Sequence, residues 1–121
     1  MNRLTEKEEQ IMKMLWQRGP LFVREMLEQY PEPKPHFNTV STFVRLMEQK
    51  GFVGHEAFGN SHRYYALIKE DEYSRSALRN VISKYFNNSM RGVVSALVAD
   101  QKLTPDELRD LIDQVERGKP T

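Results

Sequence analysis

The sequence predicts a mainly α-helical fold with one small β-hairpin, and three features of the chain support this prediction. Apolar residues recur at helical spacing along most of the chain. Two aromatic-rich segments with alternating apolar and polar residues flank Gly59 and Asn60, a pair that is typical of a tight hairpin turn. Glycines, prolines and helix-capping residues separate these segments. The expected order is therefore three helices, a hairpin and three more helices.

The first two helices have clear boundaries. Thr5 and Glu8 have the spacing of a capping box, so a helix should begin after Thr5 and end at Gly19. The second helix is expected over Val23–Tyr30, because Pro31 lacks the backbone N–H that a longer helix would need and restricts the residue before it.

The third helix, from about Phe37 to Lys50, is the most informative part of the chain. At about 100° per residue, its apolar residues fall on one face. Its opposite face is formed by Asn38, Ser41, Thr42, Arg45 and Gln49, with Glu48 at the margin. A solvated face normally carries residues of both charges, whereas a helix in the DNA major groove lies close to phosphates that repel carboxylates. The scarcity of carboxylates favours DNA recognition over simple solvation.

Three helices followed by a hairpin form the element order of a winged helix-turn-helix, in which the third helix enters the major groove. We therefore predict a winged helix-turn-helix DNA-binding domain over residues 1–68. Short polar side chains can contact phosphates and base edges, and arginine can contact O6 and N7 of guanine. The predicted contacts are to bases from Asn38, Ser41, Thr42 and Arg45, and to phosphates from Thr39 and Arg63.

The hairpin is expected from strands over Phe52–Phe58 and His62–Ile68. A two-residue loop places Glu56 opposite Arg63, so Arg63 can pair with Glu56, contact the DNA backbone, or do both. The residues expected near DNA at the hairpin tip are Asn60, His62 and Arg63. The aromatic residues expected in the core are Trp16, Phe43, Phe52 and Phe58.

Three C-terminal helices are predicted over about Lys69–Phe86, over Met90–Ala99 and after Thr104, and residues 69–121 form the second predicted domain. Because this single layer of helices is too thin to bury its own apolar faces, we expect it to associate with the same region of a second chain. The predicted dimerisation residues are Leu78, Ile82, Phe86, Val94, Leu97, Leu108, Leu111, Ile112 and Val115. The alternative is that these helices pack back on the N-terminal domain.

Composition excludes several other classes of protein. The chain has no cysteine, which excludes disulfides, thiolate zinc sites and thiol nucleophiles. No nucleophile elbow, metal triad or phosphate-binding glycine loop is present, so we expect neither an enzyme nor a cofactor. His55 and His62 fall on one face of the hairpin, but no carboxylate is expected there, so surface histidines are favoured over a metal site. No apolar segment is long enough for a membrane helix or a signal peptide, which predicts a cytoplasmic protein.

Several segments resemble the penicillinase-repressor (BlaI/MecI) family, in order and over nearly the whole chain. They are Leu4–Glu9, Ile11–Trp16, Val23–Met26, Asn38–Thr42, Arg45–Gly51, His62–Leu67 and Lys102–Leu108. The resemblance implies a homodimer that binds a palindromic DNA operator and represses transcription, often of resistance or stress genes. It also implies release when a membrane-bound metalloprotease sensor leads to cleavage in the dimerisation region.

The chain departs from this family at two places. The best-known members are cut at an Asn-Phe bond, whereas Ala96 and Leu97 stand at the corresponding position here. Copper-responsive relatives carry a C-terminal cysteine cluster, and the absence of cysteine excludes that sensing mode. The alternative function is a winged-helix protein-interaction module without DNA binding, against which the carboxylate-poor third helix argues.

Overall fold

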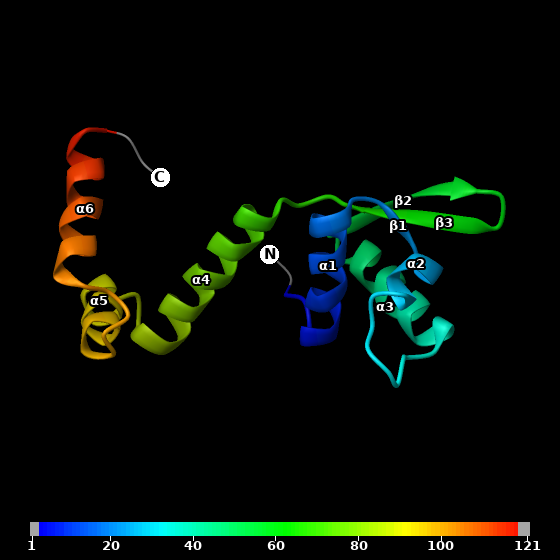
Figure 1. Cartoon of the computed structure of the whole chain (residues 1–121), viewed down its shortest axis with the longest axis horizontal. Coiled ribbons are helices and arrows are strands. Elements are labelled where there is room, and N and C mark those ends of the chain that lie inside the picture. The colour runs from blue at the N-terminus through cyan, green and yellow to red at the C-terminus, as the bar shows by residue number, and fades with distance from the viewer. Residues whose placement is uncertain (1–2, 119–121) are drawn as a thin grey trace. The chain divides into compact units, whose positions relative to one another are not determined.

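The computed structural model describes residues 3–118, which form two compact units (Figure 1). The first unit ends at Ser76 and the second begins at Ala77. Both are helical apart from one small antiparallel sheet, which confirms the predicted fold class: a winged helix followed by a helical C-terminal region. The division into a DNA-binding domain over residues 1–68 and a dimerisation region over residues 69–121 stays a prediction.

The elements follow the predicted order, with one additional short strand. They are α1 (Glu6–Arg18), β1 (Leu21–Phe22), α2 (Val23–Leu27), α3 (Phe37–Gln49), β2 (Val53–Phe58), β3 (Ser61–Ala66), α4 (Glu70–Phe86), α5 (Met90–Ala99) and α6 (Pro105–Glu116).

The hairpin has the predicted register, and a third strand completes the sheet. The strand order is β1-β3-β2, with Glu56 opposite Arg63 across the two-residue loop. Gly59 has a φ of 62° in this loop, a left-handed conformation that glycine adopts without steric cost. The unpredicted strand β1 pairs Leu21 with Tyr64. Its two residues are too few to show an alternating pattern in the sequence.

The second helix is shorter than predicted. It ends at Leu27, and the expected continuation to Tyr30 is wrong. Gln29 and Tyr30 instead form turns, with their N–H groups donating to the carbonyls of Met26 and Leu27. A residue that precedes proline is disfavoured in the helical region, which explains why Tyr30 lies outside the helix.

The core of the first unit is formed by residues from α1, α2, α3 and the sheet. Its members are Leu4, Ile11, Met12, Leu15, Leu21, Val23, Met26, Val40, Val44, Met47, Phe52, Val53 and Tyr64. Trp16 and Phe43 pack against this core, as expected. Phe58 does not, because it lies near the hairpin tip, where it is 47% exposed and contacts the edge of Phe22.

A buried ion pair fixes α3 against α1. Glu8 closes the capping box of α1 with Thr5, as predicted, but it is also 2% exposed and accepts a hydrogen bond of 2.7 Å from Nζ of Lys50. Burial alone would raise the pKa of Glu8, but the hydrogen bonds from Lys50 and from the backbone of Thr5 hold that pKa below its usual value. The last residues of α3 are therefore held against the start of α1.

The start of α4 belongs to the first unit. Tyr73 lies between Trp16 and Phe52, with ring centroids 5.8 Å from each, and its hydroxyl donates to Glu9 at 2.6 Å. Trp16 donates from Nε1 to the carbonyl of Ile68. The first turns of α4 therefore extend the aromatic part of this unit.

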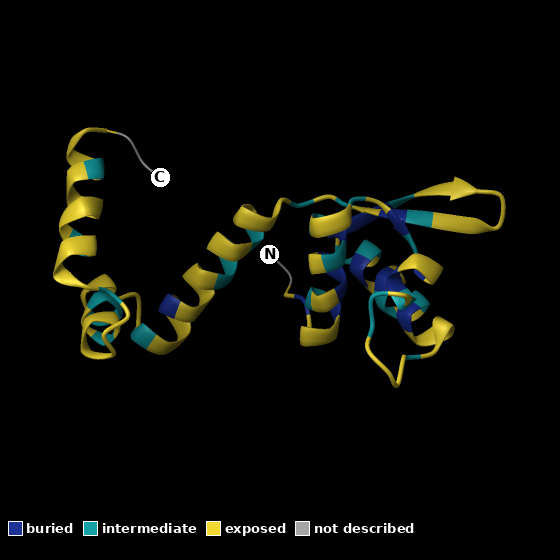
Figure 2. Ribbon diagram, viewed as in Figure 1, coloured by how far each residue is buried: buried dark blue, intermediate teal, exposed yellow. Residues whose placement is uncertain are grey.

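The second unit buries far less of its apolar surface. Among its described residues only Ile82 is buried, and Figure 2 shows α5 and α6 without any buried residue. Its exposed large apolar side chains are Leu78, Val81, Tyr85, Met90, Leu97, Val98, Leu111, Ile112 and Val115. In the part of the chain that the structure describes, no helix combines the length and the apolar character needed to cross a membrane.

Candidate nucleic-acid interface

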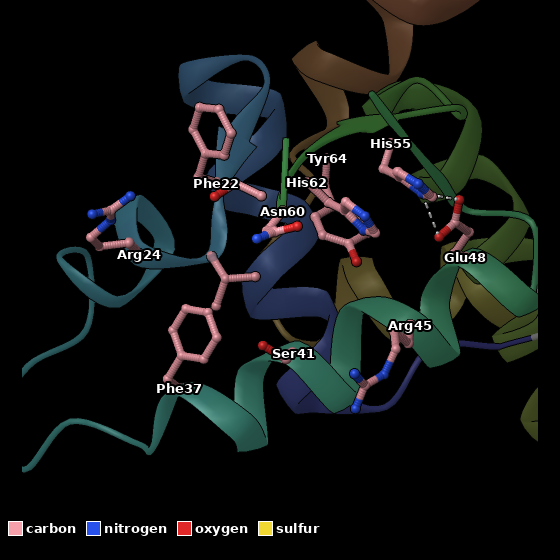
Figure 3. Close-up of a pocket in the computed structure, with 12 residues that line it drawn as sticks. Phe22, Arg24, Phe37, Ser41, Arg45, Glu48, His55, Asn60, His62 and Tyr64 are labelled. Carbon is pink, nitrogen blue, oxygen red and sulfur yellow. Dashed lines mark hydrogen bonds and ion pairs between the residues drawn. The ribbon is translucent and has the colours of Figure 1, made fainter. Parts of the chain in front are cut away.

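An open groove lies between α3, the start of α2 and the hairpin, with a volume of about 620 Å³ (Figure 3). The residues that line it are Phe22, Val23, Arg24, Phe37, Ser41, Arg45, Glu48, His55, Asn60, Ser61, His62 and Tyr64. Four predicted DNA contacts are among them, two on α3 and two at the hairpin tip. The fold thus brings the predicted recognition helix and wing to one concave surface.

The remaining predicted contacts lie outside this groove. Asn38, Thr39 and Thr42 are exposed on α3, and Arg63 is half-buried on β3. Thr39 lines a smaller groove of about 310 Å³ together with Phe43 and the proline-rich segment that precedes α3. It therefore lies on the flank of the helix, away from the wing.

Hydrogen bonds along α3 organise its polar face. Thr42 donates from its hydroxyl to the carbonyl of Asn38 at 2.9 Å, and Arg45 donates from Nη2 to the hydroxyl of Thr42 at 3.2 Å. Arg45 remains exposed, and a guanidinium has five N–H donors. One donor is used along the helix, so the others are available to an acceptor in the groove.

The wing holds Arg63 by two contacts. Its Nη2 donates to Glu56 at 3.0 Å, which confirms the predicted cross-strand pair, and its guanidinium lies 4.9 Å from the centre of the Phe58 ring. Both contacts leave Arg63 on the outside of the hairpin. Asn60 and His62 are the predicted wing residues that line the groove itself.

A compact cluster forms the floor of the groove (Figure 3). The rings of His55 and His62 stack at 4.1 Å, which confirms that both lie on one face of the hairpin. The expectation that no carboxylate lies there is wrong, because the two carboxylate oxygens of Glu48 lie 2.7 and 3.0 Å from Nδ1 of His55. In the stretch from 3 to 118, no group of three histidine, aspartate or glutamate residues is arranged to hold a metal ion.

Tyr64 connects this cluster to the core. Its burial raises its pKa, the nearby charge of Glu48 raises that pKa further, and Arg45 opposes the shift. Glu48 and Arg45, one turn apart on α3, therefore both act on the phenol of Tyr64. The floor of the groove contains charges of both signs at short range.

Reasoning from the sequence missed the residues that complete the groove. Arg24 and Phe22 reach it because β1 pairs with β3, and that pairing has no signal in a two-residue strand. Phe37, the first residue of α3, is 53% exposed although it is aromatic. An aromatic residue at the start of a polar helix face is the one signal in the sequence that could have pointed to any of these groove residues.

Comparisons with known proteins agree with the features of the fold. The family model for the penicillinase repressor matches residues 4–117. The chain is 21% identical over 109 residues to the methicillin resistance regulatory protein MecI of Staphylococcus aureus strain N315, covering 89% of each chain. It is 20% identical over 109 residues, again 89% of each chain, to MecI of Mammaliicoccus sciuri. An uncharacterized 16.5 kDa protein of Latilactobacillus sakei is 22% identical over 112 residues, covering 91% of this chain and 76% of that one.

Proposed function

Because the chain belongs to the penicillinase-repressor family, whose members are transcriptional regulators rather than enzymes, we propose that it is a homodimeric repressor of transcription. It binds double-stranded DNA at a palindromic operator in the bacterial cytoplasm. Residues 37–50 form the recognition helix in the major groove, and residues 58–63 lie near the DNA backbone. The observation that carries this proposal is the groove shared by α3 and the wing, with Arg45 on its wall.

The contacts proposed for DNA divide by their position. Ser41 and Arg45 lie toward the groove, and the exposed Asn38 and Thr42 continue the same polar face, so these four recognise base edges. Phosphates are contacted by Thr39 on the flank of the helix and by Asn60, His62 and Arg63 on the wing. Arg63 keeps its pair with Glu56 while its remaining donors face the backbone.

The exposed apolar residues of the second unit support a homodimer. Apolar side chains on all three of its helices remain open to solvent, and their burial against a second copy would release bound water. The proposed dimerisation residues include the half-buried Phe86, Val94 and Leu108 as well as the exposed Leu111, Ile112 and Val115. A two-fold dimer presents two recognition helices to the two halves of a palindrome.

We propose that a membrane metalloprotease sensor triggers release of the operator, and this part of the proposal rests on the family resemblance alone. Ala96 and Leu97, which occupy the position of the family's cleavage site, lie within α5. Because they replace the Asn-Phe bond at which the best-known members are cut, cleavage at this bond is not part of the proposal.

The test is the affinity of the Arg45→Ala variant for a DNA duplex that the wild-type protein selects from a random pool. Loss of a bidentate guanine contact should weaken binding to this duplex by about 10- to 100-fold. Binding to a scrambled duplex should change much less, and wild-type affinity should fall steeply with salt. Arg18→Ala, an exposed arginine at the end of α1, is the matched control.

Two results would contradict the proposal in different ways. An unchanged sequence preference in Arg45→Ala would remove Arg45 from the recognition surface. Failure of the wild-type protein to select any duplex, even at low salt, would favour the protein-interaction module instead.

A further inference from the structure

Glu48 is the one acidic residue among the described residues that line the groove. In the proposed complex this carboxylate faces the negatively charged DNA backbone, and an unpaired carboxylate there would weaken binding. The structure pairs it with His55, whose Nδ1 lies 2.7 Å from one carboxylate oxygen and 3.0 Å from the other. Both side chains remain about one-third exposed, so the pair lies at the surface that DNA approaches.

Groups from each neighbouring element face this pair. His62 on β3 stacks on the ring of His55 with only 12° between the planes, and Tyr64 on the same strand lies 5.6 Å away. Arg45 lies one turn before Glu48 on α3, and Arg24 lines the groove from α2. The stacked ring fixes the plane of the His55 imidazole, so its Nδ1 stays directed at Glu48.

The charge of this pair depends on one proton. With His55 protonated, imidazolium and carboxylate cancel, and the groove keeps the positive charge of its two arginines. With His55 neutral, Glu48 adds a full negative charge to the groove. Histidine is the side chain whose charge normally changes between pH 5 and 8. A ligand that prefers one protonation state must, by linkage, favour that state on binding.

We infer that His55 is a positioning residue for DNA binding: it neutralises Glu48 and holds this carboxylate toward the hairpin, so that the groove accepts DNA more tightly when His55 is protonated. This inference rests on the proposed function and adds to it a specific dependence on pH. DNA affinity should fall as pH rises, because the proton on His55 is lost and Glu48 is left uncompensated beside the phosphates.

The experiment measures fluorescence anisotropy with the selected duplex at about pH 6 and about pH 8.5, at constant ionic strength. Wild-type binding should weaken by about five- to tenfold at the higher pH, the effect of one nearby charge at a partly exposed site. Glu48→Gln should bind at the higher pH as tightly as the wild type does at the lower one, because the pair carries no net charge in either case. His55→Gln should bind weakly at both pH values, because the carboxylate is then never neutralised.

The double variant His55→Gln/Glu48→Gln separates charge neutralisation from a structural role. If His55 acts through Glu48, the double variant, in which the pair again carries no net charge, binds as tightly as the wild type does at the lower pH and shows little pH dependence. If His55 only supports the fold of the hairpin, the double variant binds clearly more weakly than the wild type does at the lower pH, and the inference is overturned. Circular dichroism melts of each variant establish that the winged unit is folded.

His62→Gln is the matched control, because it removes the other histidine of the stack and leaves the pair of His55 and Glu48. Its affinity should fall at both pH values while the pH dependence remains. Loss of the pH dependence in His62→Gln together with its survival in His55→Gln would overturn the inference and assign the effect to His62. If the wild type binds the selected duplex equally at both pH values, this inference alone is overturned. If the wild type selects no duplex at all, the proposed function is overturned as well.

Discussion

The two units of this chain are built from similar amphipathic helices, but they differ in what those helices bury. In the first unit, residues from three helices and a sheet enclose a continuous core in which Ile11, Met26 and Val44 are fully buried. In the described part of the second unit, Ile82 is the most buried apolar residue, and it is still 9% exposed. Because burial of apolar surface is the main force that stabilises a fold, we expect the first unit to fold without a partner, and the proposed dimer to bury the apolar surface of the second.

The ion pairs differ in the same way. Besides exposed pairs such as Arg63 with Glu56, the first unit contains the pair of Glu8 and Lys50, in which the carboxylate is 2% exposed. The second contains the pair of Arg109 and Asp106, in which both side chains are largely exposed. Exposed pairs contribute little to stability, whereas a buried one fixes a specific arrangement of the elements that carry it. A buried polar interaction therefore helps to position α1 and α3 in the first unit, whereas we expect association to fix the helices of the second.

The largest expected effect comes from making the same substitution in each unit. Leu15→Ala removes a side chain that is 3% exposed, and it should lower the free energy of unfolding by about 3 kcal/mol. Leu111→Ala removes one that is 44% exposed, and it should leave that free energy unchanged. Its effect should appear in the dimer, whose dissociation constant should rise by about tenfold or more, since the contact is lost from both copies.

Two measurements separate these outcomes. Trp16, the one tryptophan of the chain, lies in the first unit and reports its unfolding by urea through fluorescence. Sedimentation velocity reports the dimer, with the exposed Gln101→Ala as a control in the second unit. A wild-type protein that is monomeric at tens of micromolar would break the comparison, because the second unit would then be stable with its apolar faces open.

Local rules account for what the sequence could predict. The capping boxes of Thr5 with Glu8 and of Thr104 with Glu107 each lie within four residues, and both are present. The two-residue turn at Gly59 fixes the register of the whole hairpin. These features depend on neighbours in the chain, so their pattern is visible without any knowledge of the fold.

What could not be predicted depends on residues that are far apart in the chain. Glu8 is visible as a capping residue, but its pair with Lys50 joins positions that only the packing of α1 on α3 brings together. Glu48 and His55 face each other because the chain reverses between α3 and the hairpin. The proposed recognition face could therefore be outlined from α3 alone, whereas the charge pair at the floor of the groove could not.

Lys50→Met sharpens the comparison of the ion pairs. It leaves the buried carboxylate of Glu8 without its cation and should lower the free energy of unfolding by about 2–3 kcal/mol. The pKa of Glu8 is lower in the folded protein than its usual value of 4.5, so its contribution is present above that pH and is lost as pH falls through the folded-state pKa. In urea unfolding, the free energies of unfolding of the wild type and of Lys50→Met should therefore converge as pH falls below about 4.5 and Glu8 becomes protonated.

Lys13→Met, an exposed position on α1, the helix of Glu8, is the control for this change, and it should unfold like the wild type at both neutral and acid pH. A loss of stability in Lys50→Met that stayed constant down to pH 3 would show that packing of the lysine stem, rather than its charge, stabilises this contact.

The smallest expected effect concerns the place where α4 joins the first unit. Tyr73→Phe removes the hydrogen bond of 2.6 Å to Glu9 and keeps the ring between Trp16 and Phe52, so it should lower the free energy of unfolding by about 1–2 kcal/mol at neutral pH. Burial and the carboxylate of Glu9 raise the pKa of Tyr73 from 10.0 to about 12, since both disfavour a phenolate there. The contribution of the hydroxyl is therefore complete below about pH 10 and is lost as pH rises toward 12.

The stability difference between the wild type and Tyr73→Phe should shrink over that interval in urea unfolding followed by Trp16 fluorescence. Tyr85→Phe, at a position that is 70% exposed in the second unit, should unfold like the wild type throughout; if instead it matched Tyr73→Phe, the second unit would contain ordered polar contacts that its exposure does not show.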